Sequence, residues 1–328
     1  MAVTEITADP SPRRLSTGRP PGMATDRAFR AVTLISGLLI LVILALIIVS
    51  TVNEAWPWFE SQGLSAITSD DWNPSAGSYG ALGLIYGTFL VAFIAMLIAV
   101  PVSVGIALFV TEVSPRRMRR PIVYLIDLLA AVPSVVFGLW MLRELTEPLA
   151  NIYSSVSDAL SGLPLIGDLF ANPSASGQAF MTGGIVVGIM ITPIVTAITR
   201  EVFATTPNSQ KEAALAMGAT RWEMIRGAVF PHSRNGAVAA FMIGLGRGVG
   251  ETIAVALVVG ASPRLTANIL GPGDTMASII ANQFGEASGI QRSALIGLGL
   301  LLLVLTMLIG IMARMVLGQA DRRLGPRL

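Results

Sequence analysis

Two residues of opposite charge lie inside one of the most apolar runs of the chain. Arg247 and Glu251 fall in the middle of residues 237–260. Residues four positions apart lie one turn apart on the same side of a helix, so the two can pair. A charge at this depth in a membrane costs several kcal/mol unless it has a partner or an aqueous cavity. The pair therefore either fixes this run to a neighbour, or holds an arginine whose planar fork binds an entering oxyanion.

Polar residues and prolines in the other apolar runs add to these candidates. Pro101, Pro133 and Pro193 each free a backbone carbonyl that neighbours, hydroxyl groups or cavity water must satisfy. These prolines either line a translocation pathway or only kink the helices. Asp127 stands about two turns into its run and faces either a pathway or the protein interior. The candidate pathway residues are Asp127, Ser134, Arg247, Glu251 and Thr252.

The run that carries Arg247 also has two overlapping rows of glycine. Gly244 with Gly248, and Gly246 with Gly250, are small residues four positions apart. Such rows let helix backbones approach closely, so we predict a packing role for both. The run contains no G-x-G-x-x-G nucleotide loop.

Catalytic and metal chemistry has few residues to draw on. The chain has no cysteine, and its one histidine and one lysine are His232 and Lys211. Disulfides, thiolate sites and a histidine-ligated metal centre are therefore excluded. A Walker phosphate loop needs Gly-Lys, whereas Gln210 precedes Lys211. We predict no catalytic residue, no metal and no cofactor, so that any nucleotide driving this protein binds to another chain.

The composition predicts a membrane protein. Of the 328 residues, 53% are apolar and 13% are charged, and the mean hydropathy is +0.70, which is far from the balance of a soluble domain. Apolar runs of about 20 residues, enough to cross a bilayer, recur along the chain. We predict an all-α integral membrane protein with one transmembrane domain over residues 31–320. Its six predicted spans are about 33–52, 81–110, 122–141, 179–199, 237–260 and 293–317.

The basic residues predict the orientation of these spans. With six spans, and with Arg314 in the last turn of the sixth span included, 18 of the 22 lysines and arginines fall on the side that carries both termini, and positive charge marks the cytoplasmic side. We expect a disordered cytoplasmic tail over residues 1–30 and a cytoplasmic end at 321–328. A cleaved signal peptide is the alternative for the first run, but about 20 apolar residues exceed a typical signal core.

The polar segment before residues 237–260 predicts two short helices. Ser209-x-x-Glu212 and Thr220-x-x-Glu223 both match the capping box, in which each side chain satisfies a free backbone amide. Gly218 falls between them, where a helix stop favours a residue that tolerates positive φ.

An apolar face on the second of these helices suggests a contact surface. Trp222, Ile225 and Val229 recur at i, i+3 and i+7, and Pro231 closes the segment. By pattern alone, the helix pair either lies on lipid headgroups or docks a partner protein.

The same segment resembles a known family signature. Glu212-Ala213-Ala214, Gly218 and Pro231 are similar to the EAA motif of inner-membrane permease subunits of ABC importers, although Ala228 and Phe230 replace the Ile and Leu of that motif. The resemblance implies that coupling helices at about 209–231 dock into a groove of an ATPase subunit. The coupling residues it implies are Glu212, Ala213, Ala214, Gly218, Trp222, Ile225 and Pro231.

Residues 72–316 resemble more narrowly the PstC-type permease subunits of phosphate ABC importers. The motifs that carry this resemblance are Gly246-Arg247-x-x-Gly250-Glu251-Thr252, Trp72-Asn73-Pro74, Val132-Pro133-Ser134 and Asn282-Gln283-Phe284. Asp127 departs from it, because relatives are expected to have a longer acidic residue there.

The resemblance implies a type I ABC importer permease fold in the plasma (inner) membrane of a prokaryote. Phosphate would meet Arg247 on the translocation path, while Glu251 positions it. The implied partners are a homologous permease (PstA-like), a cytoplasmic ATPase dimer (PstB-like) and an extracytoplasmic phosphate-binding protein (PstS-like), besides inorganic phosphate and the lipid bilayer. No nucleic acid is expected.

Two other functions stay open at this point. A permease for another oxyanion, such as molybdate or sulfate, would share the coupling helices and would differ in ion competition. A stand-alone ion-coupled carrier or membrane enzyme would not co-purify with an ATPase, and an enzyme would be short of catalytic groups.

Overall fold

The computed structural model describes residues 23–163 and 167–323. The chain divides into two units, residues 1–50 and 51–328. The described residues are helical except for loops and one small hairpin, in which β1 (Trp72–Asn73) pairs antiparallel with β2 (Ser78–Tyr79). The predicted all-α character therefore holds for this part of the chain.

Four described helices are long and apolar enough to cross a membrane. The first is α1 (Met23–Gln62), which contains the predicted span 33–52 and begins within the predicted N-terminal tail; the rest of that tail lies outside the described residues. The others are α3 (Leu82–Leu108), which continues into the π-helical turn η2 (Phe109–Val113), α8 (Phe180–Ala204) and α14 (Gly289–Arg323). Each of the four overlaps one predicted span.

The third predicted span is broken. Residues 122–141 fall on α4 (Arg116–Ala130) and α5 (Ser134–Trp140), which meet at 86°. Pro133 lacks the N–H that a helix needs and disfavours helical geometry at Val132 before it. In contrast, α3 and α8 run through Pro101 and Pro193 without interruption. If the bent pair counts as one span, the described helices supply up to five.

The fifth predicted span is interrupted as well. Residues 237–260 fall on α11 (Phe230–Val249) and α12 (Ile253–Val258), with a break at residues 250–252. Gly250 ends α11 with φ of −87° and ψ of 0°. Gly244, Gly246, Gly248 and Gly250 lower the helix propensity of this stretch. Neither helix meets the length and composition of a membrane-crossing helix, so the count of six spans stays a prediction.

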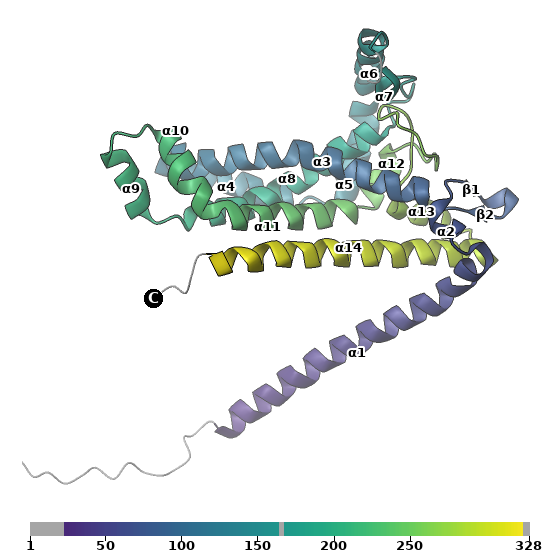
Figure 1. Cartoon of the computed structure of the whole chain (residues 1–328), viewed down its shortest axis with the longest axis horizontal. Coiled ribbons are helices and arrows are strands. Elements are labelled where there is room, and N and C mark those ends of the chain that lie inside the picture. Colours follow the sequence, from purple (N-terminus) through teal and green to yellow (C-terminus); the bar gives the residue numbers. More distant parts are fainter. Residues whose placement is uncertain (1–22, 164–166, 324–328) are drawn as a thin grey trace, which may run out of the picture. The chain divides into compact units, whose positions relative to one another are not determined.

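The remaining elements are short and connect the long helices. On the side of the β hairpin they are α2 (Ser65–Thr68), η1 (Pro74–Ala76), η3 (Met141–Leu145), α6 (Thr146–Leu160), α7 (Gly167–Phe170) and α13 (Met276–Gln283). At the opposite end of α3 are α9 (Asn208–Ala216), α10 (Arg221–Met224) and the π-helical turn η4 (Ile225–Val229). Figure 1 shows α3, α8, α11 and α14 lying alongside one another between these two ends, in agreement with their contacts.

Close packing of α3 on α8 forms the main core. A Cβ on Gly184 would overlap the side chain of Ile94, and one on Gly188 would lie 3.3 Å from Cβ of Ile98. The Ser103 hydroxyl donates a hydrogen bond of 3.0 Å to the carbonyl of Thr192 on α8. Small residues thus let the two backbones approach. The buried core around this contact also includes Met141, Val255 and Val258 from the broken helices.

A loop that ends in α13 is seated on the start of α3. The backbone N–H of Met276 donates to the hydroxyl of Thr88 at 3.0 Å. Within the loop, the Asp274 carboxylate accepts hydrogen bonds from the N–H of Thr275, at 2.9 Å, and from the Ser278 hydroxyl. Asp274 is 3% exposed. Burial raises the pKa of Asp274 from 3.8 to about 6, although its two hydrogen bonds act in the opposite direction.

The wild type should be less stable at neutral pH than at acidic pH because Asp274 ionises, and Asp274→Asn should abolish this difference. Because the folded-state pKa is raised, Asp274 stabilises the fold below pH 3.8, and this contribution is lost as the pH rises through about 6. The amide oxygen of asparagine can accept the same two hydrogen bonds and stays neutral. Melting temperatures in detergent from pH 4 to pH 8 should fall with pH more steeply for the wild type than for the variant. Parallel curves would show that Asp274 does not titrate in this range.

Candidate functional site

The break between α11 and α12 carries three of the predicted pathway residues. Arg247 lies in the last turn of α11, whereas Glu251 and Thr252 lie in the break itself. The prediction that Arg247 and Glu251 stand one turn apart on a continuous helix is therefore wrong. Gly250 ends the helix between them, and the Thr252 hydroxyl turns back to donate to the Gly250 carbonyl at 3.1 Å.

Arg247 is exposed and has no ion-pair partner among the described residues. Glu251 is half-buried and is not paired with Arg247. The cation still has one favourable interaction, because a positive charge in the last turn of a helix is stabilised by the helix dipole. Exposed apolar side chains flank it, with Ile243 one turn before it and Ile253 at the start of α12. A guanidinium in these surroundings is free to bind an anion.

Ser134 is placed near the start of a helix that packs on α12. Gly138 of α5 is buried against α12, because a Cβ at this position would lie 2.8 Å from Cα of Ala254 and 2.9 Å from Cδ1 of Leu257. Ser134 is the first residue of α5, and Thr252 directly precedes α12. The structure therefore packs together the two helices that follow the two breaks.

Asp127 lies apart from this group. It is exposed on α4, one turn before the break, and α4 packs mainly against α8. Ser134 and Thr252 lie at the starts of two helices that pack on each other, whereas Asp127 lies outside that contact.

Only one of the two predicted glycine rows packs against a neighbour. A Cβ on Gly244 would overlap the side chain of Val195, and one on Gly248 would lie 3.3 Å from Cγ1 of Val187, so this row faces α8. Gly246 has nothing within 4 Å of such a Cβ, and Gly250 meets only carbonyls of its own helix. Within the described residues the row of Gly246 and Gly250 packs against no other helix, because it faces away from α8, so its packing role stays a prediction.

The predicted helix pair before α11 is present as α9 and α10. Gly218 lies between them with φ of +89°, which is the left-handed geometry that a helix stop requires. The capping box at the start of α10 is confirmed: the Thr220 hydroxyl accepts from the Glu223 N–H at 3.3 Å, and Glu223 accepts from the Thr220 N–H at 2.7 Å. The Thr220 N–H and the Thr220 hydroxyl both donate to the Glu223 carboxylate, and these two hydrogen bonds lower the pKa of Glu223.

The capping box predicted at Ser209 is wrong. α9 begins two residues earlier than the motif requires, because Pro207 occupies the N-cap position and Asn208 is already helical. Pro207 has the fixed φ that suits a helix start, which leaves Ser209 inside the first turn.

Thr220→Ala should loosen the start of α10. Loss of an N-cap side chain costs about 1 kcal/mol, which corresponds to about fivefold faster hydrogen exchange of the amides at Glu223 and Met224. Ser209→Ala is the matched control, since Ser209 makes no capping hydrogen bond. Exchange measured by mass spectrometry should change only in the first variant. Equal exchange in both would contradict the role of the capping box.

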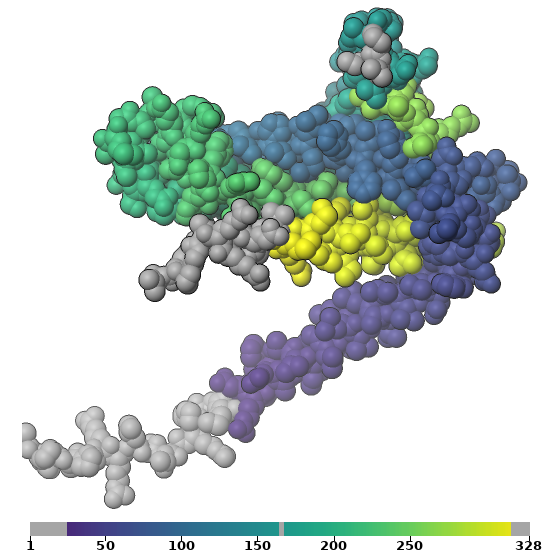
Figure 2. Space-filling view, in the orientation of Figure 1, coloured from purple at the N-terminus to yellow at the C-terminus, as the bar shows by residue number. Residues whose placement is uncertain are grey.

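The apolar face predicted on the second helix is divided in two. Ile225 and Val229 are buried and pack with Phe203 and Ala107, whereas Trp222 is 59% exposed. Trp222 packs edge-on to Phe230, with their ring centroids 6.4 Å apart. Figure 2 shows the green surface of this segment projecting at one end of the unit. Its exposed apolar side chains are Leu215, Met217 and Trp222.

Pro231 does not end the segment. The helical path runs from Arg221 through the turn η4 to Val249. A proline removes one backbone donor, and the wider π turn that precedes Pro231 accommodates this locally. Of the other predicted coupling residues, Glu212 and Ala213 are exposed on α9, and Ala214 packs beside the cluster around Phe203.

Sequence reasoning missed the contact that joins α9 to η2, the turn that continues α3. The ammonium of Lys211 lies 2.6 Å from a carboxylate oxygen of Glu112, and their side chains are 15% and 7% exposed. The one lysine of the chain is therefore largely buried. Its partner is an acid 99 residues earlier, so no local pattern indicates the pair. The one signal in the sequence is that the single lysine of the chain falls in a candidate coupling helix.

Comparison with known proteins identifies the family. The model of the family described as "binding-protein-dependent transport system inner membrane component" matches residues 99–324. The chain belongs to this family. Its members are membrane transport components rather than enzymes, and the predicted class of fold, a permease of a binding-protein-dependent importer, is confirmed.

Three relatives named "phosphate transport system permease protein PstC" illustrate the similarity. The protein from Xylella fastidiosa is 46% identical over 80% of this chain and 82% of its own length. The one from Mesorhizobium japonicum is 40% identical over 92% of both chains. A relative from Mycobacterium tuberculosis, named PstC 2, is 39% identical over 94% of this chain and 96% of its own. All three cover both helix breaks and most of the chain.

A solved structure shares the fold. The chain resembles one in the crystal structure of a bacterial alginate ABC transporter, with a TM-score of 0.56 and 18% identity over 89% of this chain and 96% of that chain. At this identity, the likeness shows the fold alone.

Proposed function

We propose that this chain is the phosphate-conducting permease subunit of an ATP-driven importer in the plasma (inner) membrane of a prokaryote. The observation that carries the proposal is Arg247, an exposed guanidinium that has no counter-ion in the described part of the chain and lies at a break between two helices. Non-helical backbone at membrane depth is tolerated where it is buried in protein or lines a water-filled cavity. The names of the relatives support phosphate as the anion.

The chain supplies one half of the pathway in this proposal. Arg247 binds the entering phosphate, Glu251 and Thr252 position it from the break, and Ser134 and Asp127 contribute from α5 and α4. A second, homologous permease covers the open side. The apolar exposed face of α4 supports such a partner, because Tyr124 and Leu125 are each 65% exposed.

Both termini lie on the cytoplasmic side in this proposal, and residues 31–320 form the transmembrane domain. The interrupted pairs α4–α5 and α11–α12 each count as one crossing, which gives six with α1, α3, α8 and α14. Residues 321–328 form the cytoplasmic end. The basic residues support this orientation, since arginines 116, 117, 119 and 120 then face the cytoplasm with α9 and α10.

The helices α9 and α10 couple the chain to a cytoplasmic ATPase dimer. Leu215, Met217 and Trp222 offer an exposed apolar surface for docking, while Ile225 and Val229 anchor the segment to the core. Because the helix runs from Arg221 to Val249, a displacement of α10 travels along roughly 35 Å of helix to Arg247. An extracytoplasmic phosphate-binding protein delivers the anion at the other end.

Transport assays test the proposal. Proteoliposomes that contain the complete importer should take up phosphate with ATP inside, and excess molybdate or sulfate outside should not compete. Competition by either ion would assign a different oxyanion. A soluble ATPase should co-purify with the wild type and be lost on changing Gly218 to valine. Uptake without any ATPase would favour a stand-alone carrier and overturn the proposal.

A further inference from the structure

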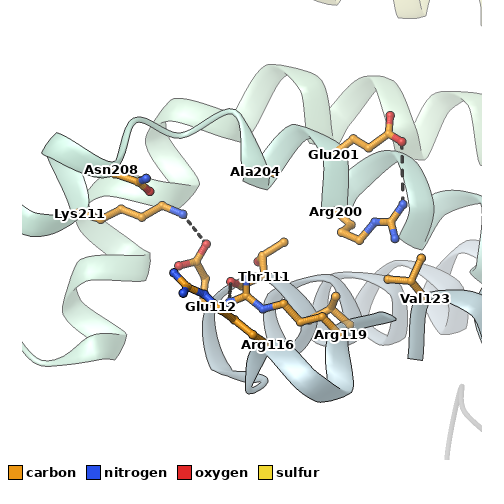
Figure 3. Close-up of a pocket in the computed structure, with 11 residues that line it drawn as sticks. Thr111, Glu112, Arg116, Arg119, Val123, Arg200, Glu201, Ala204, Asn208 and Lys211 are labelled. Atoms are coloured by element: carbon orange, nitrogen blue, oxygen red, sulfur yellow. Dashed lines mark hydrogen bonds and ion pairs between the residues drawn. The ribbon is translucent and has the colours of Figure 1, made fainter. Parts of the chain in front are cut away.

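A polar pocket lies beside α9, at the end of the helices far from the β hairpin. It has a volume of about 640 Å³ and is formed by four segments: the end of α3 with η2, the start of α4, the end of α8, and α9 (Figure 3). The residues that line it are Val110, Thr111, Glu112, Arg116, Arg119, Val123, Arg200, Glu201, Ala204, Asn208 and Lys211. Arg247 and the other predicted pathway residues are not among them.

The side chains of the pocket carry more positive than negative charge. Four are basic and two are acidic. Lys211 is neutralised by Glu112 in the buried pair. Arg119 is held by the backbone, because its guanidinium donates to the carbonyl of Thr111 at 2.6 Å and to that of Ser114 at 3.1 Å. These contacts satisfy two of the four basic groups.

The other two basic groups are available for a ligand. Arg116 is exposed and has no ion-pair partner among the described residues. Among the described residues, the one ion pair of Arg200 is a 3.9 Å contact with Glu201, whose side chain is 77% exposed, and a pair of this kind contributes little. Figure 3 shows Arg200 and Asn208 on opposite sides of the space, with Arg116 and Lys211 at one end. Two guanidinium groups and an amide therefore border the same space and are available to an anion in it.

We propose that this pocket binds an anion that carries a phosphate group. Guanidinium groups bind phosphate oxygens through paired hydrogen bonds, and the excess positive charge favours a multivalent anion over chloride. The ligand is either free inorganic phosphate or the headgroup of an anionic phospholipid. The chemistry is the same in both cases.

A bound anion would join α9 to α4 and α8. The lysine of α9 already contacts η2 through Glu112, so the anion adds a second connection on the other wall of the pocket. The site thus stabilises the helix that the proposed function assigns to ATPase docking. The binding itself does not depend on what the protein transports, because it uses none of the residues assigned to the pathway.

Hydrogen exchange of the full-length chain in lipid nanodiscs tests the site. One arm uses phosphatidylcholine with inorganic phosphate, against chloride at equal ionic strength. The other uses phosphatidylcholine mixed with phosphatidylglycerol, without phosphate. At a ligand concentration about ten times the dissociation constant, amides of residues 208–216 should exchange about tenfold more slowly. Protection in the first arm identifies free phosphate as the source, and protection in the second identifies the lipid headgroup.

The double variant Arg116→Gln, Arg200→Gln should lose this protection in whichever arm shows it. Arg117→Gln is the matched control, since Arg117 is an exposed arginine of the same run that does not line the pocket. Arg247→Ala should keep the protection, which separates this site from the pathway. The absence of protection in both arms, or equal protection in the double variant, overturns the proposal.

Discussion

Replacing Arg247 by alanine should reduce phosphate uptake about a hundredfold or more, while the protein still inserts into the membrane and still co-purifies with its ATPase. Arg247 is exposed and lacks an ion-pair partner among the described residues, so its loss leaves no buried acid without a counter-ion. The variant should therefore keep its stability. Each charge-assisted hydrogen bond to the anion contributes about 1.5–3 kcal/mol, and the guanidinium can form two.

The matched control for this prediction is Arg234→Ala. Arg234 is also exposed on α11, near the opposite end of the helix, and its loss should leave uptake within about twofold of the wild type. Arg247→Lys separates charge from shape, because lysine keeps the charge without the planar fork. An intermediate rate is expected for it. Near-normal uptake by Arg247→Ala would instead favour a structural role and remove Arg247 from the pathway.

The structure changes what is expected of Glu251. On a continuous helix, Glu251 would neutralise Arg247 at rest, and changing Glu251 alone would leave an unpaired cation in the membrane. Because Gly250 ends the helix and the two residues are not paired, Glu251→Gln should not destabilise the chain. Its effect should appear only in transport.

The sequence predicted correctly those elements that depend only on residues close together in the chain. The long apolar runs predicted α1, α3, α8 and α14, because the spanning length and hydropathy of such helices are properties of the sequence alone. The Thr220 capping box and the left-handed Gly218 were predicted for the same reason, since both depend on neighbouring residues.

The two helix breaks could be predicted only in part. Pro133 is a proline inside an apolar run and could indicate a break. Pro101 and Pro193 also lie inside apolar runs, yet their helices are continuous. What differs is the packing around each residue, which a single sequence does not contain. The same holds for the glycine rows, because spacing alone did not reveal that Gly244 and Gly248 face α8 while Gly246 and Gly250 do not.

The candidate site, too, could be predicted where it depends on local sequence and could not where it depends on tertiary contacts. Composition pointed to Arg247, because one arginine in an apolar run is unusual on any fold. The pairing of Lys211 with Glu112, and the pocket that surrounds it, join residues from four segments of the chain. Contacts of that kind depend on the tertiary structure, and no local pattern indicated them.

Gly87→Ala should destabilise the fold more than alanine at Gly83 or Gly105, the other two glycines of α3. A Cβ on Gly87 would overlap the backbone carbonyl oxygen of Asp274 and would lie 2.8 Å from Cε1 of Phe180. Backbone cannot move aside as a flexible side chain can. The loop would have to lift from α3, which also stretches the hydrogen bond from Met276 to Thr88. Overpacking of this kind costs about 1–3 kcal/mol, or a fall of about 2–6 °C in melting temperature.

Gly105→Ala is the matched control, because Gly105 is on the same helix and has nothing within 4 Å of an added Cβ. Alanine favours a helix over glycine by about 1 kcal/mol, so this variant should melt at or above the temperature of the wild type. Thermal unfolding in detergent compares the two variants directly. If Gly87→Ala has the same melting temperature as Gly105→Ala, the loop before α13 is not held closely on α3. If it melts several degrees lower, that loop is held closely against α3, as the contact between Gly87 and the Asp274 carbonyl requires.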